Sequence, residues 1–230
     1  MLRILFALLF FTSVLPAQTA LSFRPILDGR VLRSGADNAA GHDGAVAGAR
    51  RVEVLRWYLS DIRFLQDGTT VFTPAKRHHL LDLEAPAGLN LQLATPPGLN
   101  YDEVSFTLGV DSLTAASGAF GGDLDPTRGM YWTWRSGYIN FKLEGTDPEC
   151  PVRQNRFQFH VGGFQGPFAS QREVTLKVSP AAIVPVYLNL DRFFKTVNVK
   201  KQYQVMSPNE ASAKMADLLA ELFSAERQSS

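Results

Sequence analysis

The chain has 230 residues, 45% of them hydrophobic and 11% aromatic, which is enough to fill the core of a single domain. Its 23 basic and 22 acidic residues leave a formal net charge of +1, so there is no electrostatic reason to expect nucleic acid or an anionic membrane as a partner. The only cysteine, Cys150, excludes an internal disulfide, and stability must come from packing.

The chain begins with the pattern of a secretory signal peptide. The basic residue Arg3 is followed by the apolar run ILFALLFF and then by SVLPAQ, with no acidic residue before Asp28. The apolar run is shorter than the roughly 18 residues that a membrane span needs. We predict a signal peptide over residues 1–17, with cleavage after Ala20 as the alternative. The rest, residues 18–230, is predicted to be one exported domain, periplasmic or extracellular, without a membrane span.

Short segments with alternating polarity, bounded by Gly, Pro, Asn and Asp, recur along the mature chain. They include VEVLRWYLSDIRFL, EVSFTLGV, GYINFKLEG, RFQFHVGG and VPVYLNLD. Their period of two and their spacing predict an all-β fold, an antiparallel β-sandwich. The first of these strands is long, and we expect it to bend near Ser60 and Asp61 and to end in a hairpin turn at Asp67 and Gly68.

The segments between and after the strands have different signals. Two stretches rich in Gly and Asp, residues 35–48 and 117–129, are predicted to be surface loops. Near the end, residues 207–210 (SPNE) have the pattern of a capping box with proline at the first helical position. The helix predicted to follow should pack against the sandwich through an apolar stripe at helical spacing: Met215, Leu218, Leu219, Leu222 and Phe223.

A search for catalytic patterns finds little support for an enzyme. The sequence contains no G-x-S-x-G elbow, H-E-x-x-H pair, Walker loop or dinucleotide fingerprint. Asp123 and Asp125 lack the further oxygen ligands of a calcium loop, and turn or cap chemistry explains them. We therefore expect a protein without catalytic activity.

The segment GMYWTWRSGY, residues 129–138, holds two of the three tryptophans. In an extended conformation Met130, Trp132 and Trp134 share one face. In one interpretation these side chains fill the sandwich core or cover its rim. In the other, the aromatic and thioether groups form a site that stacks on a sugar or holds a soft metal ion such as Cu(I).

The histidines are the second group of candidate ligands. In RFQFHVGG the core face carries Phe157 and Phe159, so His160 points the other way, either as a structural polar residue or as a metal ligand. His78 and His79 are adjacent on a predicted strand, so they point to opposite faces and cannot chelate one ion together.

Several of these segments together resemble a known family. The succession YDEVSFTLGVD, GGDLDPTRGMYWTWRSGYINFKLEG and FQFHVGG is similar to the MbnP-like family of secreted copper-binding proteins, and the most specific part is MYWTWRSGY joined to the FHVGG strand. The resemblance covers nearly the whole mature chain. It implies a β-rich domain, no catalysis of its own, copper as the bound ion, as Cu(I), and a role in copper handling, as in a copper chaperone.

The resemblance also implies which residues act. In relatives a tryptophan is oxidised to kynurenine, which binds Cu(I) together with histidines, and a dihaem enzyme of the peroxidase type is associated with the oxidation. Here the modified residue would be Trp132 or Trp134, and the matching histidine would be His160. Relatives have a further histidine two residues from the tryptophan, which this chain lacks. The candidates for the missing ligand are Met130, His78, His79 and Met206.

Three hypotheses follow. The chain is a secreted copper-binding protein, or a non-catalytic module that binds a glycan or a protein through its aromatic cluster without metal, or a substrate whose tryptophan a haem enzyme oxidises. The third is compatible with the first, which we prefer.

Overall fold

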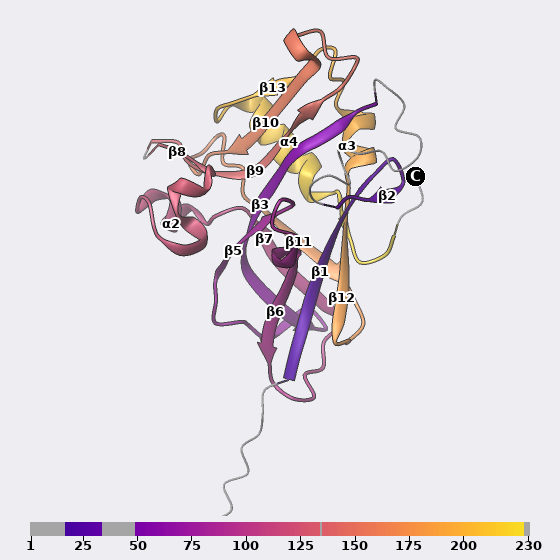
Figure 1. Ribbon diagram of the computed structural model, residues 1–230. Coiled ribbons are helices and arrows are strands. Elements are labelled where there is room, and N and C mark those ends of the chain that lie inside the picture. The colour runs from indigo at the N-terminus through magenta and orange to yellow at the C-terminus, as the bar shows by residue number, and fades with distance from the viewer. Residues whose placement is uncertain (1–16, 34–48, 134, 228–230) are drawn as a thin grey trace, which may run out of the picture.

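The computed structural model describes residues 17–33, 49–133 and 135–227, which fold into two β-sheets packed face to face (Figure 1). Nearly all of the predicted signal peptide, the predicted loop at residues 35–48 and the tryptophan at position 134 lie outside the described residues. Within the described ranges, no helix has the length and apolar character that crossing a bilayer would require.

The smaller sheet has the order β14-β12-β1-β2, and β6 also pairs with β1. Its strands are β1 (Ala17–Leu27), β2 (Arg30–Val31), β6 (Asn90–Thr95), β12 (Ile183–Asn189) and β14 (Phe223–Ser224).

The larger sheet has the order β11-β7-β3-β9-β10-β13, with β4 and β5 paired to β3, and β8 paired to β9. The strands are β3 (Arg51–Gln66), β4 (Thr69–Phe72), β5 (His78–Asp82), β7 (Glu103–Leu108), β8 (Tyr131–Thr133), β9 (Gly137–Thr146), β10 (Arg156–Gly162), β11 (Arg172–Lys177) and β13 (Gln204–Val205).

The prediction of a β-rich fold is confirmed, but a purely antiparallel arrangement is wrong. β1 and β12 run parallel, and so do β10 and β13, which makes both sheets mixed. Alternating polarity shows which side chains share a face, but it is the same for strands of either direction. The partners of each parallel pair are separated by long stretches of chain, so no short turn in the sequence reveals their direction.

The long strand β3 behaves as predicted. Its pairing shifts between Ser60 and Arg63, where Asp61 takes a positive φ of 52°. The hairpin turn follows at Asp67 and Gly68, with φ values of 50° and 74°.

The helices are short and join or cover the sheets. They are α2 (Ser112–Ala116), α3 (Leu190–Thr196) and α4 (Glu210–Ala220), with 3₁₀ turns η1 (Pro86–Leu89), η2 (Gly122–Leu124), η3 (Pro126–Arg128) and η4 (Arg153–Asn155). The predicted loop at residues 117–129 thus contains η2 and η3, and most of it is exposed.

Helix α4 confirms the predicted C-terminal helix with two corrections. The cap is Asn209 and not Ser207, because the Asn209 side chain accepts a hydrogen bond from the backbone N–H of Ser212 at 2.8 Å. The apolar stripe predicted for this helix also extends beyond the end of the helix. Met215 is buried against the core as predicted, but the helix ends before Phe223, which pairs with β12 as part of strand β14.

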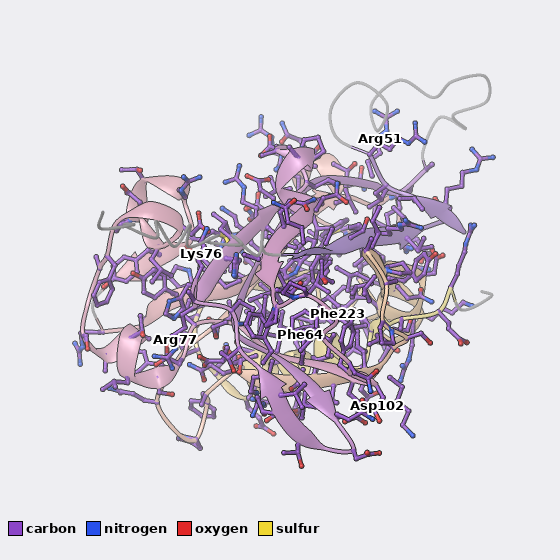
Figure 2. The ribbon with its side chains drawn as sticks, turned by 90° about the horizontal axis from the view of Figure 1, so that it is seen from below. Arg51, Phe64, Lys76, Arg77, Asp102 and Phe223 are labelled. Atoms are coloured by element: carbon purple, nitrogen blue, oxygen red, sulfur yellow. The ribbon has the colours of Figure 1, made fainter. Side chains whose placement is uncertain are left out.

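The main core lies between the two sheets. Phe23 of β1 contacts Trp57 of β3 at a ring-centroid distance of 6.0 Å, and Phe106 of β7 contacts Phe223 at 5.5 Å. In Figure 2, Phe64 and Phe223 lie near the middle of the molecule. Each large aromatic residue of this kind buries roughly 150–250 Å², so these contacts are a major part of what holds the sheets together.

Candidate metal site on the outer face of the larger sheet

Strands β9 and β10 alternate between the core and the outer face of the larger sheet. Phe141 and Phe159 point into the core and are each 1% exposed. Lys142 and His160, which are directly paired across the two strands, therefore point to the outer face. This agrees with the orientation predicted for His160, which is nevertheless only 6% exposed.

His160 is held by a carboxylate on the neighbouring strand. Its Nε2 lies 2.7 Å from Oε1 of Glu144. The same carboxylate is 3.3 Å from Nζ of Lys142 and 3.7 Å from Nη2 of Arg156. Glu144 is itself 9% exposed, so this group of charges is largely shielded from solvent.

The environment determines the protonation of this pair. Burial raises the pKa of the Glu144 carboxyl, but the hydrogen bond with His160 and the charge of Lys142 outweigh burial and hold this pKa below its usual value. Burial lowers the pKa of His160, and this exceeds the opposing effect of the hydrogen bond to Glu144. At neutral pH a carboxylate only accepts hydrogen bonds. Nε2 therefore carries the single N–H of the neutral ring and donates a hydrogen bond to Glu144.

The other ring nitrogen of His160 is then the one with a lone pair. Nδ1 makes no hydrogen bond to any of the described residues. A neutral imidazole that donates one N–H to a carboxylate and keeps its second nitrogen free is the usual arrangement of a metal-binding histidine.

The loop before β8 is anchored beside this histidine. Arg56 of β3, directly paired with Lys142, donates from Nη1 to the carbonyl of Arg128 at 3.1 Å. Nζ of Lys142 donates to the carbonyl of Gly129 at 3.4 Å. Gly129 has a φ of 72°, and there the chain turns into β8. Arg56 and Lys142, which are neighbours across β3 and β9, thus position the segment that carries Trp132.

Trp132 lies over the strand that carries His160. A Cβ atom added to Gly162 would be 2.9 Å from Cζ3 of Trp132, so the indole packs directly on this glycine. Gly162 is two residues after His160 on β10, which corresponds to roughly 7 Å along a strand. Trp132 is half-buried, and its ring lies over the part of β10 that follows His160.

Met130 belongs to a second apolar cluster on the outer face. The methionine is fully buried and packs in a group with Tyr58, Leu124 and Tyr138, while Trp132 covers the same group from the side. The structure thus gives Met130 a packing role, as in the first interpretation of this segment.

The other two candidate histidines lie elsewhere. His78 lies 3.0 Å from a carboxylate oxygen of Asp111, and buried His79 lies 3.1 Å from the carbonyl of Lys76. Both are on β5, which is separated from β10 by β3 and β9. Three strand spacings amount to about 14 Å, so neither histidine reaches His160.

Ordinary metal ligands do not gather anywhere in the described parts of the chain. No group of three or more His, Cys, Asp and Glu residues occurs there in metal-binding geometry. Cys150 is buried, with Sγ 3.0 Å from the carbonyl of Arg156.

Glu144 is the residue that sequence reasoning missed. The alternation in GYINFKLEG puts it on the outer face together with Lys142, and this much can be seen in the sequence. Its contact with His160 depends on the register between β9 and β10, which no local pattern specifies.

Comparisons with known proteins agree with this architecture. A protein-family model described as MbnP matches residues 16–207. Among solved structures, MbnP from Methylosinus trichosporium is similar with a TM-score of 0.56 and 15% sequence identity, and the match covers 80% of this chain and 79% of that one. At this identity the likeness concerns the fold. A search of curated proteins finds no match.

Proposed function

Since the chain belongs to the MbnP family, whose model covers residues 16–207, we propose that it is an exported copper-binding protein without catalytic activity, acting in the periplasm or outside the cell. The ion is Cu(I), and the role is that of a copper chaperone. His160 is the protein ligand.

One observation carries this proposal. Nε2 of His160 donates to Glu144 over 2.7 Å, while Nδ1 has no partner among the described residues. An Nδ1 lone pair kept free supports a ligand role.

Trp132 extends the proposal. Its half-buried indole lies beside β10, two residues from His160. A partner dihaem enzyme of the peroxidase type would use two molecules of hydrogen peroxide, each a two-electron oxidant, to cleave the C2–C3 bond of the indole, so that each carbon gains one oxygen and two molecules of water are released. Hydrolysis then releases the C2 carbon as formate. The product, kynurenine, has an aniline nitrogen and a ketone, so a side chain that could only donate gains ligand atoms. Trp134 remains the alternative target.

The test is an anaerobic Cu(I) titration of the mature protein against a chromogenic chelator. The wild type should withhold about one copper from the chelator, and His160→Ala should withhold none. His78→Ala is the matched control, since this histidine is remote from β10 and should leave copper binding unchanged. Equal copper retention by wild type and His160→Ala would refute the proposed ligand.

A second candidate function rests on exposed apolar side chains near β8. Leu113 on α2 is 76% exposed, and Phe120 and Phe168 are 44% and 37% exposed. Exposed aromatic residues of this kind are typical of surfaces that bind a sugar or a protein. A module of this type would change its tryptophan fluorescence with a glycan or a protein and would not respond to copper.

A further inference from the structure

The strand that follows β10 in the sheet brings a methionine beside His160. β13 pairs in parallel with β10, and the register joins Gln158 to Gln204 and Phe159 to Val205 (Figure 1). β13 ends at Val205, and the same register continued by one residue along both chains would bring Met206 next to His160. Neighbouring strands are about 4.8 Å apart, so this places the two residues in adjacent positions.

The two side chains share the outer face. Phe159 and Val205 are both buried in the main core, at 1% and 3% exposure. Because side chains alternate along an extended chain, the next residue on each strand points away from that core. Met206 is 40% exposed, consistent with a side chain on the outer face.

The segment after Met206 is held against the same end of β10. A Cβ atom added to Gly163 would be 2.8 Å from Cβ of Pro208, so the proline packs directly on this glycine. The hydroxyl of Ser212 donates to the carbonyl of Gly162 at 3.2 Å. Met206 is thus fixed on both sides, by β13 before it and by these contacts after it.

Met206 also differs from the other methionines of the mature chain. Met130 and Met215 are 0% and 4% exposed and pack in the two apolar clusters. The thioether of Met206 is exposed, so it gains little from apolar burial. It does have the soft sulfur that monovalent copper prefers.

We propose that Met206 supplies the thioether ligand that pairs with Nδ1 of His160, in place of a second histidine. This deepens the proposed function, on which it rests. The two ligands are neutral and soft, and together with Trp132 in oxidised form they would surround one Cu(I) ion from three segments of the chain. Met206 is the ligand that connects the C-terminal part of the domain to the site.

The experiment uses the mature protein labelled with ¹³C at the methionine methyl groups, which gives one NMR signal for each of Met130, Met206 and Met215. Anaerobic addition of Cu(I) should shift the Met206 signal until one equivalent is bound and leave the Met215 signal in place. Met206→Leu assigns the signal and should also weaken copper binding in the chelator competition by roughly tenfold or more, about 1.4 kcal/mol. Met130→Leu is the matched control and should not weaken it.

The outcomes separate the two proposals. If the wild type binds copper and His160→Ala does not, but the Met206 signal is unmoved and Met206→Leu binds as tightly as wild type, the Met206 proposal is wrong and the copper function stands. If wild-type protein whose intact mass shows the oxidised tryptophan binds no copper, both are wrong. Because Met206 is exposed, its replacement by leucine should leave folding intact, and a circular dichroism spectrum of the variant checks this.

Discussion

Glu144 offers the sharpest test of how the candidate site works. Glu144→Ala removes the one partner that Nε2 of His160 has among the described residues, which lies 2.7 Å away, and leaves the imidazole free to rotate or to change its tautomer. Loss of such a supporting carboxylate typically lowers metal affinity by about 10–100-fold. This corresponds to about 1.4–2.7 kcal/mol. We expect Glu144→Ala to bind Cu(I) more weakly by that factor.

Glu144→Gln separates charge from geometry. The amide oxygen can still accept from Nε2, but the negative charge is lost, and hydrogen bonds to charged acceptors are roughly twice as strong as neutral ones. The affinity of Glu144→Gln should therefore lie between those of the wild type and Glu144→Ala. The assay is the same anaerobic chelator competition, with thermal unfolding recorded for each variant.

Glu53 provides the matched control for these variants. Its carboxylate pairs with Arg156 at 3.0 Å and is 42% exposed, so Glu53→Gln removes a charge from the same face without touching His160. An unchanged affinity in Glu144→Ala, or an equal loss in Glu53→Gln, would refute the argument that Glu144 positions the histidine.

Three further predictions concern the fold. Gly162→Ala should destabilise the protein by about 1–3 kcal/mol in urea unfolding, because its Cβ would be 2.5 Å from the carbonyl of Tyr138, whereas Gly88→Ala meets no atom within 4 Å and should have little effect. Hydrogen bonds with Thr114 and the nearby charges outweigh burial and lower the pKa of Asp111 to about 2. The carboxylate therefore contributes stability above pH 4 that is lost as the pH falls towards 2, and Asp111→Asn should flatten an acid titration of stability in this window. Finally, cleavage of the signal peptide should leave Gln18 as the first residue, which pairs with Ala94 of β6. The measurement is N-terminal sequencing of the secreted protein, and a first residue beyond Ala20 would contradict this prediction.

Much of the fold could be predicted from alternation alone. The period of two in RFQFHVGG correctly separates the core-facing Phe159 from His160. The local turn chemistry of Asp67 and Gly68 correctly marks the end of β3. Both signals come from residues that are close together in the sequence, so nothing about the rest of the chain is needed to interpret them.

Other features depend on contacts between distant segments. The parallel direction of β12 beside β1 depends on how the chain crosses between sheets, and alternation does not encode that. The predicted start of α4 is wrong by two residues because Ser207 and Asn209 are both good caps, and only the contacts of the preceding segment decide between them. Likewise, the sequence alone makes Glu144 an ordinary surface position, and only the register between β9 and β10 brings its carboxylate to His160.

The second apolar cluster has a consequence for dynamics. Tyr58 follows the core-facing Trp57 on β3 and so points to the opposite face, where Tyr138 of β9 packs against it, which places this cluster across the larger sheet from the main core. Segments that unfold locally and cooperatively generally coincide with such separately packed clusters. A small cluster opens at a lower free energy than the main core. The segment from α2 to β8 can then open while the other strands of both sheets stay folded. Backbone amides there should exchange with deuterium before those of β3, and each opening would uncover the buried part of the Trp132 side chain.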